Sequence, residues 1–258
     1  MYRWLNELLA DRTGGEVFTC FGGWHLLYVL VAAGLAAVLL LLWRKRARSD
    51  RERAAGYLID AAFSLYLLDF FLMPLAYGEI DIEKLPFHIC TQTCVLCFLS
   101  RHVQRLSKYR VHFALIGFIS NLVYLIYPAG VMWHQVHPLS YRVVQTLLFH
   151  AVMTVYGLLV LIYEGNKLFL RTCYRDLLIL SGITAFAIFG NLCYNGEHLD
   201  YRHFFNWFFV VRDPFYLLPE AISPYVMPFV NITLFFSAEI LVYLILLVVK
   251  RKQHGQKG

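Results

Sequence analysis

The sequence predicts an all-α fold, a polytopic bundle of seven transmembrane helices that forms one membrane domain over residues 1–258. Hydrophobic residues make up 59% of the chain and charged residues only 16%, whereas about a quarter of a soluble domain is charged. The charges are also clustered, and several stretches of about 20 residues, the length that crosses a bilayer core of roughly 30 Å, contain almost none. Basic residues gather between these stretches, as they do in the loops of membrane proteins.

Seven apolar stretches are long enough, or nearly long enough, to cross a bilayer. In chain order, the predicted spans are 22–43, 55–76, 85–100, 111–128, 142–163, 175–194 and 224–249. The third span has 16 residues and would be about 24 Å long as a helix, so we expect it to begin below the membrane surface. Residues 1–21 are amphipathic and too polar for a cleavable signal peptide, and we expect them to lie on the surface.

The distribution of basic residues predicts that the N-terminus is outside and the C-terminus inside. With this orientation the inner loops hold 17 of the 23 Lys and Arg residues, in agreement with the positive-inside rule. We interpret the formal charge of +6 as attraction of these loops to anionic lipid head groups. The expected location is the cell membrane, and no nucleic-acid partner is expected.

The longest stretch between spans, residues 195–223, is aromatic rather than polar. Such a segment is expected in the membrane interface, where it would form an outer lid over a lipid acyl chain that enters from the side. An aromatic belt that only anchors the protein is the alternative interpretation.

Polar side chains within the spans fall at similar depths when each is counted from the outer end of its own span. A polar group in the bilayer is costly unless it is paired or faces a cavity, so these positions are the first candidates for function. The layer lies about 5–12 Å below the outer surface by helical rise. Its members are Asp69, His88, Cys90, Asn121, His150, Asn191 and Asn231. Ordinary hydrogen bonds between helices are the alternative explanation.

The stretch "KLPFHICTQTCVLCFLSRH" at 84–102 places two histidines and three cysteines on a short apolar segment. The cysteines are spaced i, i+4 and i+7 and therefore share one helical face. This spacing is typical of small packing residues, whereas metal ligands converge from separate turns or loops, so we expect no metal site. His88 and Gln92 lie together on another face of the helix, and Cys90 does not lie on that face.

The polar layer contains the residue types that acyl transfer requires. A thiol is nucleophilic only as the thiolate, which apolar surroundings disfavour and a nearby imidazole base restores. His150 in the fifth span is the candidate base, with Cys90 as the candidate nucleophile. Alternatively, His88 and His150 act as acid and base on a bound ester or water. Other polar side chains would stabilise the oxyanion or bind the substrate: Asn121, Asn231, Asn191, Asp69, Gln92 and Tyr216.

Two acidic residues, Asp60 and Glu239, lie in the inner halves of their spans, and Arg53 and Lys250 are too far along the chain to be assured partners. Buried acids of this kind favour a small-solute transporter or a seven-span ligand-binding protein. Against transport, the sequence shows no inverted repeat and no pair of broken spans. A scaffold for other membrane proteins is a third alternative.

Several segments resemble the YwaF-like family of bacterial integral membrane proteins: "GGWHLLYVL", "LPFHIC", "GFISNLVYLIYPAG", "VVQTLLFHAVMTVYGLLVLIYEG" and "SAEILVYLILL". That family is distantly similar to a vertebrate membrane enzyme that moves fatty acyl chains between phospholipids with a cysteine and a histidine. The resemblance places His25 in the family's early histidine position and implies His150 and His88 as site residues. The cysteine does not carry over, because this chain has Phe87 directly before the span-three histidine. Cys90 matches the bacterial pattern instead.

From these observations we expect a membrane-embedded lipid-modifying enzyme, an acyltransferase or lipid hydrolase. It would move an acyl chain from a membrane phospholipid to a lysolipid or another acceptor. In the expected mechanism, His150 removes a proton from Cys90 or from a hydroxyl group of the acceptor. Asparagine side chains hold the oxyanion, and His88 orients or protonates the leaving group. This scheme requires no cofactor.

Overall fold

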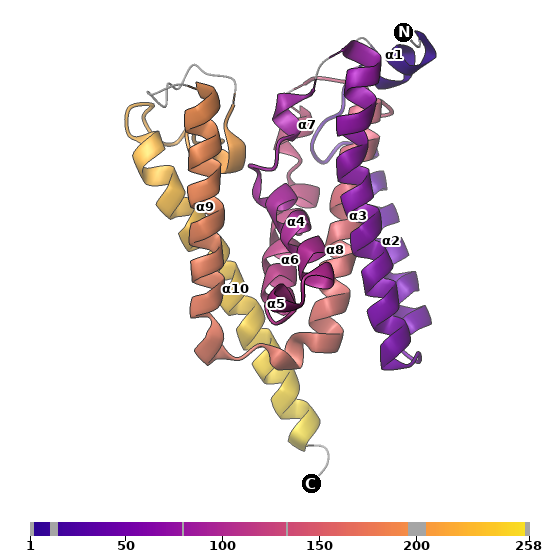
Figure 1. The fold of residues 1–258 in the computed structure, drawn as a ribbon, viewed down its shortest axis with the longest axis vertical. Coiled ribbons are helices and arrows are strands. Elements are labelled where there is room, and N and C mark those ends of the chain that lie inside the picture. Colours follow the sequence, from indigo (N-terminus) through magenta and orange to yellow (C-terminus); the bar gives the residue numbers. More distant parts are fainter. Residues whose placement is uncertain (1–2, 11–14, 79, 133, 196–204, 256–258) are drawn as a thin grey trace. The chain divides into compact units, whose positions relative to one another are not determined.

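The computed structural model describes residues 3–10, 15–78, 80–132, 134–195 and 205–255, and every regular element within these ranges is a helix (Figure 1). The chain divides into two compact units. Unit 1 comprises residues 1–84 and 120–159, and unit 2 comprises residues 85–119 and 160–258. The chain passes from one unit to the other within α6 (Arg110–Ile126) and α8 (Tyr141–Glu164), and between residues 84 and 85.

Six helical stretches are long and apolar enough to cross a membrane, which confirms the predicted class of multi-pass helical membrane protein. They are Gly23–Trp43, Arg48–Ala76, Arg110–Met132, Tyr141–Lys167, Leu170–Tyr194 and Ser223–Val249. The predicted third span differs, because its helix α4 (Ile89–His102) has 14 residues and is only about 21 Å long. The described residues therefore contain six spans by length, while the seventh span and the orientation of the termini stay predictions.

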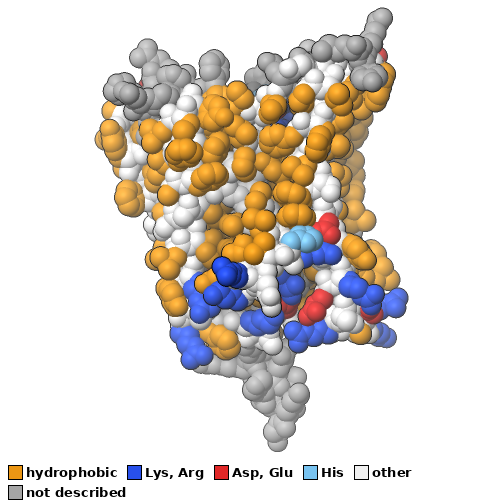
Figure 2. Space-filling model, in the orientation of Figure 1, with side chains coloured by type: hydrophobic (Ala, Val, Ile, Leu, Met, Phe, Trp, Pro, Cys, Tyr) orange, Lys and Arg blue, Asp and Glu red, His pale blue; other side chains and the backbone are white. Residues whose placement is uncertain are grey.

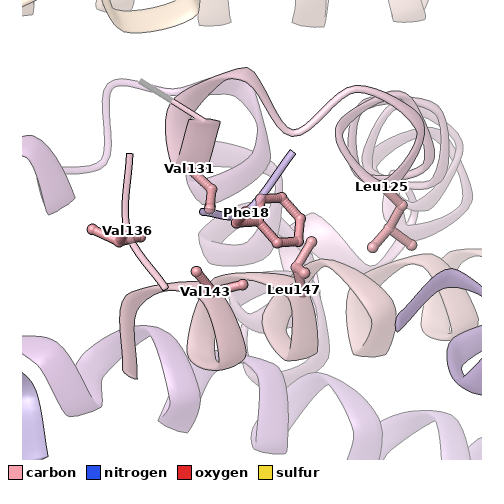
Figure 3. Close-up of a cluster of buried hydrophobic side chains, with 6 residues drawn as sticks. All are labelled: Phe18, Leu125, Val131, Val136, Val143 and Leu147. Carbon is pink, nitrogen blue, oxygen red and sulfur yellow. The ribbon is translucent and has the colours of Figure 1, made fainter. Parts of the chain in front are cut away.

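Unit 1 contains a hydrophobic core that is built around Phe18 (Figure 3). Its helical elements are α1 (Arg3–Leu9), α2 (Gly23–Trp43), α3 (Arg48–Tyr77), η1 (Ile82–Lys84), the end of α6, α7 (Ala129–Met132) and most of α8. The Phe18 ring packs with Leu125, Val131, Val136, Val143 and Leu147. The backbone N–H of Phe18 also donates to the Val136 carbonyl at 2.9 Å. The segment before α2 is thus part of the core of unit 1.

The helix α2 turns almost all of its apolar side chains outward. Its 21 residues have a mean hydropathy of 2.6 over the most apolar window, and none of that window is buried inside the protein. His25 is the buried residue of this helix. A helix that is apolar on every side suits a lipid environment. Figure 2 shows exposed hydrophobic side chains over much of the visible face, with Lys and Arg side chains near one end of that face.

Unit 2 is built on two long helices that pack against each other, α9 (Tyr174–Asn195) and α10 (Ser223–Gly255) (Figure 1). Its shorter elements are α4, α5 (Gln104–Ser107), the start of α6, η2 (Gly165–Lys167), η3 (Leu170–Thr172) and η4 (Trp207–Phe209). Buried residues of α9 recur every three or four positions, as at Leu180, Ile183 and Ala187, and form one helical face. The short helix α4 also packs against α9.

Phe87, which directly precedes His88, lies against α9 at Gly190. Its ring packs at centroid distances of 4.9 Å from Phe186 and 5.0 Å from Trp207. A Cβ atom on Gly190 would overlap the Phe87 ring. The glycine is therefore needed for the close approach of the segment before α4 to α9.

We expect Gly190→Ala to destabilise unit 2 by about 1–3 kcal/mol, the usual cost of overpacking a filled core. The methyl group would push the Phe87 ring out of its aromatic surroundings. Denaturation of the purified protein in detergent measures the loss. Gly182→Ala on the same helix is the matched control, because no atom lies within 4 Å of a Cβ there. Equal stability of both variants and the wild type would contradict the prediction.

Candidate functional site

His150 lies on α8, among polar and aromatic side chains of unit 1. Its side chain is 5% exposed. Its Nδ1 atom is 2.7 Å from Oδ1 of Asn121 on α6, and its ring stacks on Tyr124 with a centroid distance of 3.7 Å. Asn121 is fully buried. Two members of the predicted polar layer, from different spans, are therefore in direct contact.

The hydrogen bond to Asn121 assigns the tautomer of His150. An amide oxygen only accepts hydrogen bonds, so Nδ1 carries the hydrogen and Nε2 carries the lone pair of the neutral ring. The orientation of the Asn121 amide is consistent with this assignment, because its nitrogen faces Ser120 Oγ at 3.4 Å. Nε2 is then the atom that accepts a proton, as a general base requires.

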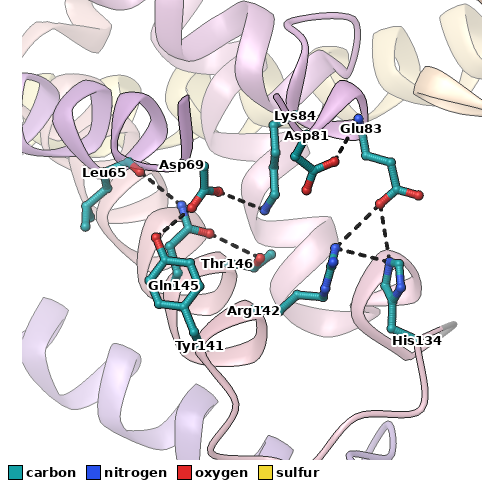
Figure 4. A network of polar contacts seen from close by, with 10 residues as sticks. All are labelled: Leu65, Asp69, Asp81, Glu83, Lys84, His134, Tyr141, Arg142, Gln145 and Thr146. Carbon is teal, nitrogen blue, oxygen red and sulfur yellow. Dashed lines mark hydrogen bonds and ion pairs between the residues drawn. The ribbon is translucent and has the colours of Figure 1, made fainter. Parts of the chain in front are cut away.

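Asp69 is held in a network of polar contacts in unit 1 (Figure 4). Its Oδ1 atom accepts a hydrogen bond from the Tyr141 hydroxyl at 2.6 Å, and its Oδ2 atom lies 3.1 Å from Lys84 Nζ. Nearby, Oε2 of Glu83 lies 3.4 Å from Nε2 of His134 and 3.5 Å from Nη1 of Arg142. These contacts tie α3, η1 and α8 together, which gives Asp69 a structural role in addition to the predicted substrate-binding role.

His25 is fixed by backbone groups. Its Nδ1 atom accepts the Phe21 N–H at 2.9 Å, and its Nε2 atom lies 2.8 Å from the Leu125 carbonyl oxygen, to which it donates. The side chain is 1% exposed. With both ring nitrogens occupied, His25 joins α2 to α6 within unit 1, and these contacts account for a buried histidine at this position.

In unit 2, His88 and Gln92 bind backbone groups of other elements. His88 precedes α4 in an extended conformation, and its Nδ1 atom accepts the Phe208 N–H at 3.2 Å. The Gln92 amide donates to the carbonyl oxygens of Phe87 at 3.0 Å and Ile183 at 3.1 Å. The start of α4 is thereby connected to α9 and to η4.

Asn191 and Asn231 hold the same irregular segment around η4. Asn191 both accepts from the Trp207 N–H at 3.2 Å and donates to the Trp207 carbonyl at 3.1 Å. Asn231 donates to the carbonyls of Phe208 at 2.7 Å and Phe209 at 3.3 Å. The amide donors that were predicted to hold an oxyanion are thus directed at backbone carbonyls of residues 207–209.

The backbone of η4 adopts a conformation that needs such support. Phe208 and Phe209 have φ angles of 56° and 52°, and positive φ is unfavourable for bulky L-residues. Three side chains fix this backbone segment: His88 directly before α4, Asn191 on α9 and Asn231 on α10. The described part of the predicted lid, 205–223, is therefore an ordered segment, while residues 196–204 lie outside the described residues.

Asp213 organises the turn that follows. Three backbone N–H groups donate to its carboxylate: those of Phe215, Leu217 and Leu218, at 2.7–3.0 Å. Burial raises the pKa of the Asp213 carboxyl, but the three N–H donors lower it by more, so that the pKa lies below its usual value. Tyr216 lies on this turn with 62% of its surface exposed, and the Arg212 guanidinium lies 4.5 Å from its ring centroid.

The pKa of Asp213 predicts how the turn responds to acid. A carboxyl group whose pKa is lower in the folded state stabilises that state fully above the unfolded pKa of about 3.9, and this contribution is lost as pH falls through the folded pKa. We expect the 213–218 turn to open on acidification below about pH 4. Hydrogen exchange of the amides at 215–218, corrected for intrinsic rates, measures this opening.

Asp213→Asn is expected to increase the same exchange already at neutral pH, because an amide offers one acceptor oxygen where the carboxylate uses two. Glu220→Gln, at an exposed position, is the control and should leave the exchange unchanged. Wild-type protection at 215–218 that is constant from pH 7 to strong acid would contradict the prediction.

The cysteines of α4 lie in the interior of unit 2. Cys90 is 8% exposed, and Cys94 and Cys97 are fully buried. Within the ranges that the structure describes, no three His, Cys, Asp or Glu side chains are placed to hold a metal ion.

The candidate residues divide between the two units. Unit 1 contains Asp69, Asn121 and His150, and unit 2 contains His88, Cys90, Gln92, Asn191, Tyr216 and Asn231. Within unit 1 the structure brings His150 and Asn121 together, and within unit 2 it gathers His88, Asn191 and Asn231 around residues 207–209. The pairing of His150 with Cys90 stays a prediction.

Two features were not predicted from the sequence. Tyr124, which stacks on His150, lies three residues after Asn121 and hence on the same helical face, a spacing that would have identified it. A buried hydrogen bond joins His112 on α6 to Asp176 on α9. Both residues lie near the starts of their helices, outside the depth range in which the polar layer was counted.

Comparison with known proteins identifies one family. The model of the TMEM164 family matches residues 20–249. No curated protein and no solved structure matched the chain.

Proposed function

Because the chain belongs to the TMEM164 family of membrane proteins and buries a histidine in the tautomer of a base, we propose that it is a membrane-embedded lipid-modifying enzyme. The proposed reaction moves an acyl chain from a phospholipid to the hydroxyl group of a lysolipid or another acceptor. The observation that supports it most directly is the 2.7 Å hydrogen bond between His150 Nδ1 and Asn121 Oδ1.

In the proposed mechanism, Nε2 of His150 takes the proton from the acceptor hydroxyl. The resulting oxygen nucleophile attacks the ester carbonyl of the donor lipid, one ester bond forms and the original one breaks. The proton then passes from the imidazolium to the leaving alkoxide, which restores neutral His150. Asn121 holds the ring in the correct tautomer and stabilises the imidazolium by accepting its Nδ1–H, the part that the third member of a catalytic triad performs.

A second route places Cys90 between donor and acceptor. In that route the thiolate is the first nucleophile, and the acyl chain passes through a thioester before the acceptor receives it. Burial of Cys90 disfavours its thiolate, so the direct route to a hydroxyl acceptor is preferred here. Cys90 is still the residue to test against the direct route. The chain resembles the YwaF-like family, and that family is similar to an acyltransferase that uses a cysteine and a histidine.

The basic loops supply a second, weaker contact with lipid in this proposal. Three basic side chains are exposed at the end of α4, in α5 and directly after α5: Arg101, Arg105 and Lys108. Each such residue at an anionic surface contributes roughly 1 kcal/mol of attraction. We propose that these side chains contact anionic head groups in the cell membrane.

The test is an assay of purified full-length protein in vesicles that contain a phospholipid with a labelled acyl chain and an unlabelled lysolipid. The wild type is expected to transfer the label, and His150→Ala is expected to lose the transfer. His102→Ala, at an exposed histidine, is the matched control and should behave as the wild type. Lipid profiles of cells that make each variant test the same change in vivo.

Cys90→Ser distinguishes the two routes, because it removes the thiol at little change of volume. Retained transfer supports a hydroxyl acceptor that reacts directly, and lost transfer supports the thioester. If wild-type protein that is folded neither transfers nor hydrolyses the labelled chain, the proposed enzyme function is wrong.

A further inference from the structure

A second polar group is buried in unit 2, apart from the residues around η4. It consists of His112 on α6, Asp176 on α9, and Glu239 and Tyr243 on α10. Each of these side chains is at most 4% exposed. We refer to these four residues as the acid cluster.

Asp176 has a hydrogen-bond donor for each carboxylate oxygen. Nδ1 of His112 donates to Oδ1 at 2.7 Å, and the Tyr243 hydroxyl donates to Oδ2 at 2.6 Å. Hydrogen bonds of this kind to a carboxylate stabilise its ionised form. Both carboxylate oxygens of Asp176 have hydrogen-bond donors of this kind.

Glu239 is as fully buried as Asp176 but lacks such donors. Neither of its carboxylate oxygens has a hydrogen-bond partner within the described part of the chain. It lies four residues before Tyr243 on α10, hence on the same helical face and one turn away from the Tyr243–Asp176 hydrogen bond. A buried carboxylate without a donor or a cation is very unfavourable, and such a group takes up a proton instead.

The surroundings favour a proton over a metal ion. The charge of Asp176 disfavours a second negative charge nearby, and no metal-holding group of His, Cys, Asp and Glu occurs among the described residues. The basic residue next to Asp176 on α9, Arg175, is partly buried, and its guanidinium donates to the Tyr174 hydroxyl oxygen at 3.4 Å. The helix α4 also packs against α9, and its buried titratable side chains are the thiols of Cys90, Cys94 and Cys97, which apolar surroundings keep neutral.

We propose that the Glu239 carboxyl is a binding site for one proton, which it holds while Asp176 remains ionised. Binding and release interconvert Glu239–COOH with Glu239–COO⁻ and a free proton, and no other group changes its bonds. Ionisable residues at such positions in membrane helices mark proton sites and proton pathways. This site lies in unit 2 and involves none of the residues of the proposed acyl transfer.

Infrared spectroscopy of the full-length protein in a detergent without ester groups tests the proposal, because a protonated carboxyl has a carbonyl stretching band that is separate from the carboxylate and amide bands. The wild type is expected to show this band at neutral pH and to lose it only in alkaline solution. Glu239→Gln is expected to abolish the band. Asp69→Asn is the matched control, since Asp69 is equally buried but is paired with Lys84, and it should retain the band.

Isotope labelling keeps the test decisive even if Glu239→Gln does not fold. Carbon-13 in the side-chain carboxyls of glutamate should shift the wild-type band, and the same label in aspartate should not. A wild type without the band at neutral pH, a band that survives Glu239→Gln, or a band that shifts with labelled aspartate would each overturn the proposal. The reference spectra are recorded in buffer with choline as the cation. If replacing choline by sodium removed the band, the site would hold a metal cation in place of the proton, and the proposal would be wrong as well.

Discussion

His150→Gln is expected to reduce the rate of acyl transfer by about 10²- to 10⁴-fold, the usual effect of losing a general base. The glutamine amide can still donate to Asn121 Oδ1, where His150 Nδ1 now lies at 2.7 Å, but it has no nitrogen lone pair that accepts a proton at neutral pH. Because the base acts in the transition state, kcat should fall while KM changes little. Initial rates over a range of labelled phospholipid in vesicles measure both constants.

Asn121 variants show whether the hydrogen bond to His150 matters as a positioning device. Asn121→Leu removes the acceptor and should lower kcat, whereas Asn121→Asp keeps an acceptor oxygen facing Nδ1–H and should restore most of the rate. A purely structural role of Asn121 would instead lower stability in Asn121→Leu with no change of kcat for the folded fraction. Wild-type turnover by a folded His150→Gln variant would exclude His150 as the base.

The largest expected loss of stability comes from Asn191→Leu. Asn191 satisfies both the N–H and the carbonyl group of Trp207, and Trp207 itself is 1% exposed. Leaving two buried backbone groups without partners costs about 1–3 kcal/mol each, or about 2–6 kcal/mol together. Denaturation of the purified variant and hydrogen exchange at 205–212 measure the global and the local part of this loss.

Ser181→Ala provides the comparison on the same helix, because Ser181 is exposed and bonds only to the carbonyl one turn before it. Its free energy of unfolding should stay within about 0.5 kcal/mol of the wild type. If Asn191→Leu retained wild-type stability and wild-type exchange at 205–212, the segment around η4 would not depend on the Asn191 amide.

The transmembrane helices could largely be predicted from the sequence, since a long apolar run is sufficient on its own to identify a span. The region of α4 shows where this reasoning stops. Apolarity alone placed a span from residue 85, whereas the helix begins at Ile89 after an extended His88. His88 is held there by a hydrogen bond from Phe208, 120 residues further along the chain. No pattern within residues 85–100 encodes such a partner.

The candidate site was accessible to prediction to the same limited extent. Counting depth along each span placed Asn121 and His150 at one level, and the structure joins them. The same count placed Asn191 and Asn231 in that layer, but it could not tell that their amides bind the backbone of residues 207–209. That segment has no helical periodicity, so its exposed and buried backbone groups leave no signal in the sequence. The depth of these polar side chains could be predicted from the sequence, whereas their backbone partners could not.

The late position of the partners of α4 has a consequence for biosynthesis. Gln92 binds the carbonyl of Ile183, 91 residues later, and His88 binds the amide of Phe208 later still. A ribosome therefore releases the segment around α4 long before the groups that complete its hydrogen bonds exist. Until α9 and η4 have been synthesised, Gln92 and His88 lack these hydrogen-bond partners. Final placement of α4 is thus one of the last events in the maturation of the newly made chain.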